Sequence, residues 1–187
     1  MNDVMTRNVV NDIDLTALGE VVEHIGVDPA RALVSFAVST RWTGQTSSIS
    51  TVKGYELAGE HIAREFEIVA DEPLELLGTN RAPNPQELLM SALNACMTVG
   101  YVAGAATRGI TLDRLEIDTR GQLDLRGFLG LDEAVAPGYH SLDYVVRIAG
   151  DGTPEQFADI HRGVMATSPN YFNMARPIRM NGTLSLD

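Results

Sequence analysis

The sequence predicts an α+β fold, in which a block of strands precedes one long helix and further strands and a helix follow it. Two observations support this prediction. On both sides of residues 85–108, apolar and polar residues alternate with the two-residue period of half-buried strands. Residues 85–108 are instead a long apolar stretch that opens with helix start signals. We therefore expect three N-terminal strands, a long buried central helix, two strands, a second helix and a closing strand.

Residues 1–32 are predicted to form a helical extension ahead of the main domain, residues 33–187. Asp12 or Asp14 can cap a short helix, because apolar residues recur three and four positions apart after them. The apolar positions are Leu15, Leu18, Val22 and Ile25. The helix should end at Asp28, since the residue before a proline is disfavoured in helical conformation.

The three N-terminal strands follow directly. The first alternates apolar and polar side chains from Val34 and runs into a turn at residues 43–45. The second and third are expected at 47–57 and 60–70, and a polar, proline-bearing loop leads from there to Asn84.

The central helix has the clearest start signal in the chain. Asn84 can serve as N-cap and Pro85 as the first helical residue, and the Glu87 carboxylate can reach back to the amide of the cap. The helix should end at Arg108 and Gly109.

An uncharged run from Leu88 to Thr107 raises the question of a membrane span. Polar side chains interrupt it, and much of its bulk is alanine and glycine, which favours a helix buried on all sides in a soluble core. Gly100 and Gly104 would let another backbone approach closely. We expect no membrane span.

After the central helix we expect strands near 111–124 and 140–149 and a second helix. The box Thr153-Pro154-Glu155-Gln156 opens that helix, which stops before Ser168 and Pro169. The closing strand has its apolar face at Ile178, Met180, Gly182, Leu184 and Leu186.

The amino-acid composition and the motifs that are missing exclude several classes of function. With 187 residues and a formal net charge of −11, the chain fits one acidic domain and does not fit a protein that neutralises nucleic-acid phosphates. Its single cysteine cannot form an internal disulfide, and no signal-like segment begins the sequence, so a cytoplasmic location is expected. Scattered histidines and the lack of glycine-rich phosphate loops predict no metal and no nucleotide cofactor.

Cys96, near the middle of the central helix, is the one candidate nucleophile. A lone free cysteine is most often a small buried hydrophobic residue, and the sequence spacing supplies no cationic neighbour that would make it reactive. Both interpretations stay open on pattern alone.

Two segments resemble the OsmC/Ohr family, named for osmotic induction and organic hydroperoxide resistance. Residues 82–89 and 92–96 are similar to its central-helix motif. Residues 166–169 and 175–178 are similar to the region where many members carry a second cysteine before proline. The resemblance covers about residues 33–187 and implies an intertwined homodimer whose central helices pack together.

For the peroxidase members, the resemblance implies a cysteine that attacks an organic hydroperoxide and a second cysteine that resolves the sulfenic acid as a disulfide. Cys96 matches the attacking residue, whereas Ser168 stands at the resolving position. An arginine and a glutamate assist in those members. The glutamate position is Gln86 here, with Glu87 beside it as a helix-capping or catalytic residue.

The arginine is expected near the first hairpin tip. This chain has Gln45 there, with Arg41 or Arg81 as the substitute.

Two functions follow. The first is a one-cysteine or degenerate hydroperoxide reductase that uses an external thiol reductant. The second is a non-catalytic dimeric binding protein for a small apolar ligand, in which Cys96 only packs. A cleft of that kind would be lined by side chains that are otherwise plain core: Met90, Met97, Met165, Tyr171, Phe172 and Met174.

Overall fold

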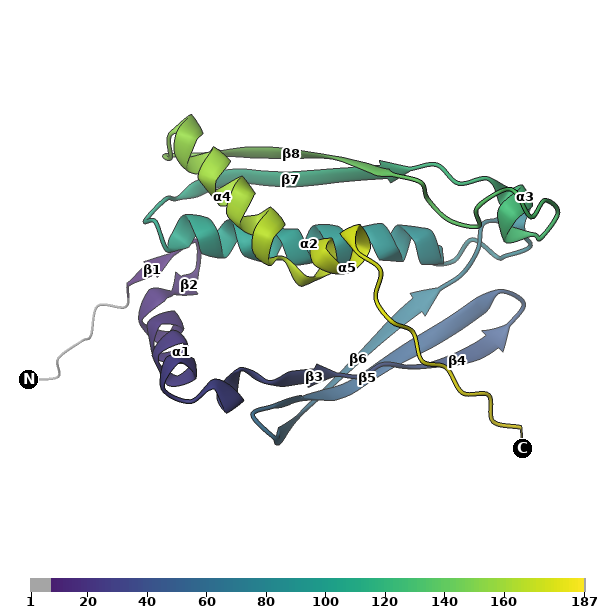
Figure 1. Ribbon diagram of the computed structural model, residues 1–187, viewed down its shortest axis with the longest axis horizontal. Coiled ribbons are helices and arrows are strands. Elements are labelled where there is room, and N and C mark those ends of the chain that lie inside the picture. The colour runs from purple at the N-terminus through teal and green to yellow at the C-terminus, as the bar shows by residue number, and fades with distance from the viewer. Residues whose placement is uncertain (1–7, 187) are drawn as a thin grey trace, which may run out of the picture. The chain divides into compact units, whose positions relative to one another are not determined.

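The computed structural model describes residues 8–186, and the chain has the predicted α+β architecture (Figure 1). Its residues group into two compact units that divide between Ser91 and Ala92, inside the long helix α2 (Pro85–Ala106). The boundary between the expected extension and the main domain, at residues 32 and 33, stays a prediction.

The N-terminal unit begins with a small hairpin and a helix. Their bounds are β1 (Val9–Val10), β2 (Ile13–Asp14) and α1 (Leu15–Val27). The hairpin was not predicted. The helix was, and Asp14 rather than Asp12 is its N-cap, with a carboxylate that accepts from the backbone N–H groups of Thr16 and Ala17 at 3.0 and 3.1 Å. Asp28 ends the helix, as its place before Pro29 predicts.

Residues 34–70 of this unit form one antiparallel sheet. Its strands are β3 (Val34–Phe36), β4 (Ser39–Gly44), β5 (Ser47–Leu57) and β6 (Glu60–Ala70). β3 and β4 pair with opposite ends of β5, so the first predicted strand is present in two pieces. The pairing slips by one residue between the pairs Phe36↔Tyr55 and Ser39↔Thr51, which accounts for the break.

A buried carboxylate organises the loop between β6 and α2, which includes the short 3-10 helix η2 (Leu74–Leu76). Asp71 is 1% exposed and accepts hydrogen bonds from the Thr46 and Thr79 hydroxyls and from the backbone N–H groups of Glu72, Thr79 and Arg81. The Thr79 hydroxyl, followed by the other donors, holds the pKa of Asp71 well below its usual range against the opposing effect of burial.

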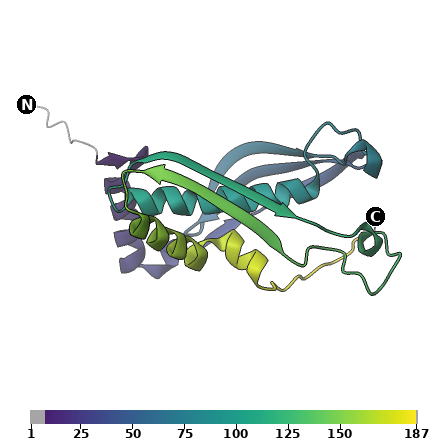
Figure 2. The same ribbon diagram turned by 90° about the horizontal axis from the view of Figure 1, so that it is seen from above.

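The C-terminal unit contains the rest of α2 and the last five elements. These are β7 (Leu112–Gly121), α3 (Leu125–Phe128), β8 (Leu142–Gly150), α4 (Pro154–Thr167) and α5 (Pro169–Ala175). β7 and β8 form an antiparallel pair that runs alongside α2 (Figure 2). The predicted capping box at Thr153 and Gln156 opens α4. The two short helices α3 and α5 were not predicted.

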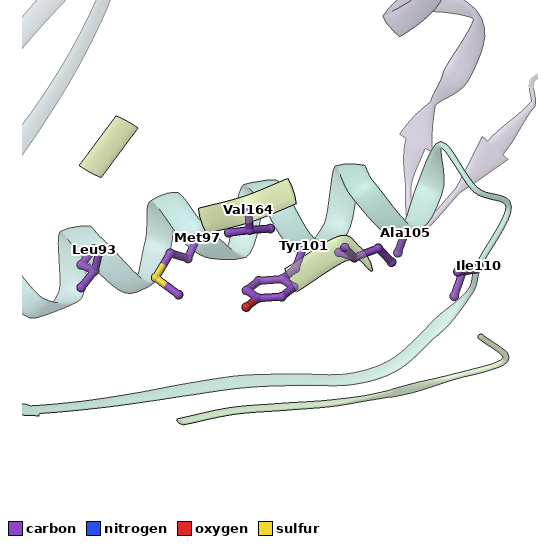
Figure 3. Close-up of a cluster of buried hydrophobic side chains, with 7 residues drawn as sticks. Leu93, Met97, Tyr101, Ala105, Ile110 and Val164 are labelled. Atoms are coloured by element: carbon purple, nitrogen blue, oxygen red, sulfur yellow. The ribbon is translucent and has the colours of Figure 1, made fainter. Parts of the chain in front are cut away.

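The core of this unit lies on one face of α2. Leu93, Met97, Tyr101 and Ala105 repeat every four residues and point toward the strands (Figure 3). Ile110, Ile160 and Val164 complete the buried cluster.

Helices α2 and α4 approach closely at two glycines. A Cβ atom at Gly100 would lie 3.1 Å from Cγ2 of Val164, and one at Gly104 would lie 3.1 Å from Cγ2 of Ile160. Both glycines thus face side chains of α4 in the same chain, and the close approach of another backbone stays a prediction.

The expectation that α2 is buried on all sides is wrong for the single chain. Leu89 is 41% and Val99 69% exposed, because β7, β8 and α4 cover only adjoining faces of the helix. By length and hydropathy, α2 is the one helix among residues 8–186 that could cross a bilayer, and core helices of soluble domains share this composition.

The predicted closing strand is also not present as a strand. Residues 177–186 take part in none of the strand pairs of the described chain. Ile178, Met180, Leu184 and Leu186 are between 53% and 85% exposed. Alternation of apolar residues is a necessary condition for a strand, but the backbone groups also need a neighbour, and the described chain supplies none.

Candidate functional site

Cys96 lies at the edge of the buried face of α2. The next residue, Met97, is fully buried, whereas Cys96 itself is half-buried and its thiol is free. A side chain one position away on a helix is turned by about 100°. Cys96 therefore borders the core without being enclosed by it.

Ser168 is the side chain that meets Cys96. Its hydroxyl donates a hydrogen bond to Sγ of Cys96 over 3.3 Å, although the two residues are 72 positions apart. Ser168 is 5% exposed, and its Oγ also accepts from the backbone N–H of Tyr171 at 3.5 Å. The position that the family resemblance assigns to a resolving cysteine thus faces Cys96.

Local sequence explains how Ser168 reaches this place. Its backbone N–H donates to the carbonyl of Val164 and closes α4, and Pro169 then starts α5 in a new direction. The amide of Asn170 donates to the carbonyl of Ala92 at 2.8 Å, one helical turn before Cys96. Two polar contacts thus fix the α4–α5 corner against α2.

This pair can support thiol chemistry but not an internal disulfide. A serine has no sulfur with which to resolve an oxidised Cys96. Among residues 8–186, the one side chain that forms a hydrogen bond with the sulfur of Cys96 is Ser168.

Glu87 caps the central helix. Its Oε2 accepts from the backbone N–H of Asn84, and the Asn84 side chain accepts from the backbone N–H of Glu87, both at 2.8 Å. The predicted capping role is confirmed. Glu87 lies in the N-terminal unit, and a catalytic role for it stays a prediction.

The candidate arginines belong to the N-terminal unit as well. Arg41 is an exposed residue of β4 opposite Ile49, and the backbone N–H of Arg81 donates to Asp71. Gln45, at the hairpin tip, has a positive φ of 45°, and its carbonyl accepts from the indole of Trp42. Cys96 and Ser168 lie in the other unit, so assistance by either arginine stays a prediction.

The methionine and aromatic residues of the alternative cleft belong mainly to the core. Met97 is a core residue, and Met165, Tyr171 and Met174 pack against the same cluster. Phe172 is 49% exposed. Among residues 8–186, no group of three or more His, Cys, Asp and Glu side chains is arranged to hold a metal ion.

One contact was missed by the sequence analysis. The hydroxyl of Tyr101 on α2 and Nδ1 of His161 on α4 lie 2.5 Å apart. No short motif joins residues 60 positions apart, so no local signal could have indicated this pair.

The geometry defines a class of protein: an α+β domain whose central helix presents a single thiol to the corner between two later helices. The chain belongs to the OsmC-like protein family, whose sequence model matches residues 78–181, more than half of its length. The family and the one-cysteine character indicated by the sequence are thereby confirmed.

Solved structures share the fold. An OsmC-like protein from Mycoplasma pneumoniae is 16% identical, with a TM-score of 0.59, and the match covers 75% of this chain and 87% of that one. A proposed osmotic stress induced and detoxification response protein from Psychrobacter arcticus is 14% identical, with a TM-score of 0.56 and coverage of 72% and 85%. No curated protein matches the chain. At these identities the likeness concerns the fold.

Proposed function

We propose that this protein is a one-cysteine, thiol-dependent reductase of organic hydroperoxides that serves in the oxidative stress response. The observation that carries the proposal is the contact between the Ser168 hydroxyl and the sulfur of Cys96. It joins the two positions that the family resemblance gives to the attacking and the resolving cysteine, and Cys96 is the free thiol there.

The first step forms sulfenic acid. The Cys96 thiolate attacks the terminal oxygen of the hydroperoxide, so that an S–O bond forms and the O–O bond breaks. The leaving alkoxide takes a proton from solvent and departs as the alcohol. Cys96 is oxidised by two electrons, and the peroxide is reduced by two.

The second step needs an external thiol, because Ser168 cannot supply sulfur. One thiol attacks the sulfenic sulfur, releases water and leaves a mixed disulfide on Cys96. A second thiol attacks the reductant's sulfur in that mixed disulfide. The two reductant thiols leave joined as a disulfide, and Cys96 returns to its reduced form.

Ser168 would serve as a positioning residue in this cycle. The Tyr171 backbone N–H donates to the oxygen of Ser168, which orients the hydroxyl proton toward Cys96. A fixed donor of this kind holds the sulfur of Cys96 in one orientation for attack on the peroxide.

The proposal includes a homodimer in the cytoplasm. Support for the dimer comes from apolar surface that the single chain leaves uncovered, on α2 at Val99 and in the extended segment 177–186. A second copy would cover both. Support for the cytoplasm comes from the dependence on external thiols, which a reducing compartment keeps available.

Turnover of cumene hydroperoxide with dithiothreitol tests the proposal. Wild-type protein should consume the peroxide catalytically, whereas Cys96→Ser should not. Ala95→Ser, an exposed neighbour on the same helix, is the matched control and should retain activity. Equal rates for wild type and Cys96→Ser would reject the proposal.

A further inference from the structure

A pocket separate from the Cys96 site opens inside the C-terminal unit, between α2, β8 and α4. Its volume is about 370 Å³, within the range of small-molecule sites, about 300–1,000 Å³. Neither Cys96 nor Ser168 lines it. The lining side chains are Tyr101, Tyr144, Val146, Ile148, Phe157 and His161.

The polar centre of this pocket is the pair Tyr101 and His161. The phenol hydroxyl and Nδ1 lie 2.5 Å apart, and the two rings stack at an interplanar angle of 25°. Tyr101 is 1% exposed, and this burial, together with the nearby Tyr144, raises the pKa of its hydroxyl to about 12. Nδ1 is the hydrogen-bond partner that the described chain gives this buried hydroxyl, so the phenol proton points to Nδ1 and Nδ1 accepts.

That hydrogen bond determines which ring nitrogen of His161 can donate to the pocket. An imidazole ring that accepts at Nδ1 carries its proton on Nε2. Among residues 8–186, no protein group forms a hydrogen bond with Nε2 of His161. His161 thus brings an N–H donor without a protein partner to the pocket.

The remaining walls offer no competing donor. The hydroxyl of Tyr144 donates to the sulfur of Met165 at 2.8 Å, and its ring meets Tyr171 edge to face. Val146, Ile148 and Phe157 contribute apolar surface. Aromatic walls with one N–H donor match a flat aromatic molecule that carries one acceptor oxygen.

We propose that this pocket binds a small planar aromatic molecule with an uncharged carbonyl oxygen, whose ring packs against Tyr144 and Phe157 and whose oxygen accepts from Nε2 of His161. An uncharged acceptor is favoured because the chain carries a formal net charge of −11, which disfavours an anionic ligand. The site is independent of thiol chemistry.

Two probes that differ in one oxygen test the proposal on the unaltered protein. 2-Acetonaphthone has the carbonyl, and 2-ethylnaphthalene has similar size and shape without it. Titration is followed by NMR through the ring nitrogens of His161 and by calorimetry. One hydrogen bond should make the affinity for the ketone roughly threefold to tenfold higher than the affinity for the hydrocarbon. Binding of the ketone should also change the NMR chemical shift of Nε2.

Variants assign the preference to His161. His161→Phe should bind both probes equally, whereas His24→Phe, an exposed histidine on α1, should keep the preference for the ketone. Cys96→Ser should bind like wild type, so loss of peroxide turnover and loss of ketone binding are separable results. Equal affinity of wild-type protein for the two probes, absence of binding, or shifts confined to residues outside the pocket would overturn the proposal.

Discussion

The hydroxyl of Ser168 lies 3.3 Å from the sulfur of Cys96, close enough that a sulfur at position 168 should reach its partner. We predict that Ser168→Cys forms a disulfide with Cys96 on mild oxidation. Thiol titration before and after diamide treatment measures this. The control is Thr167→Cys, one residue earlier and exposed, which should keep both thiols. Two free thiols in oxidised Ser168→Cys would contradict the geometry of the site.

Asp71 should give the N-terminal unit an acid-sensitive loop. Because hydrogen bonds depress its pKa in the folded state, its contribution to stability is complete above the unfolded value of 3.8 and is lost as the pH falls toward the folded value. Asp71→Asn should therefore flatten the decline of the urea midpoint below pH 4. The exposed Asp113→Asn serves as control and should follow wild type. An unchanged slope in Asp71→Asn would contradict this account.

At the residue scale, sequence reasoning succeeded where the contact is local. The pair Asn84 and Glu87 could be predicted because a capping box spans only three residues. The pair Tyr101 and His161 could not, since only the packing of α4 on α2 brings its members together. The contact of Cys96 with Ser168 could be predicted only from the family resemblance, because no local pattern joins the two residues.

The packing of α2 against α4 requires a residue without a side chain at position 100, which is Gly100. Gly100→Leu should destabilise the fold by about 1–3 kcal/mol, because even its Cβ would crowd Val164. Gly163→Ala is the contrasting change on α4, since a Cβ there meets nothing within 4 Å, and it should stabilise by about 0.5–1 kcal/mol. Thermal unfolding distinguishes the two. A Gly100→Leu protein as stable as wild type would contradict the close approach.

At the element scale, prediction was reliable for elements with their own start signals. Helices α1, α2 and α4 each begin at the expected cap. The first strand was predicted whole but is divided, because the slip in register arises from pairing with β5 and not from its own alternation. The closing strand failed for a related reason, since alternation cannot supply a neighbouring strand.

The uncovered apolar segment 177–186 should contribute to a dimer interface. If a second copy covers its apolar face, Leu184→Asp should raise the dimer dissociation constant at least tenfold, given that burying a leucine contributes about 1.5–3 kcal/mol. Thr183→Asp adds the same charge at the preceding position, on the opposite face of an extended segment, and should leave the dimer intact. Sedimentation equilibrium measures both. A wild-type protein that sediments as one chain at micromolar concentration would refute the dimer.

At the scale of the whole molecule, the sequence predicted the class of fold and the family, while the chemistry that we propose depends on one thiol. The central claim is that an organic hydroperoxide oxidises Cys96 once, and that the sulfenic acid persists until an external thiol reduces it. Rapid mixing with cumene hydroperoxide in the absence of reductant, followed by intact-mass analysis, tests it most directly. We predict one equivalent of peroxide consumed and one oxygen atom gained at Cys96, reversed by added dithiol. A Cys96 that stays reduced under excess hydroperoxide would contradict the account.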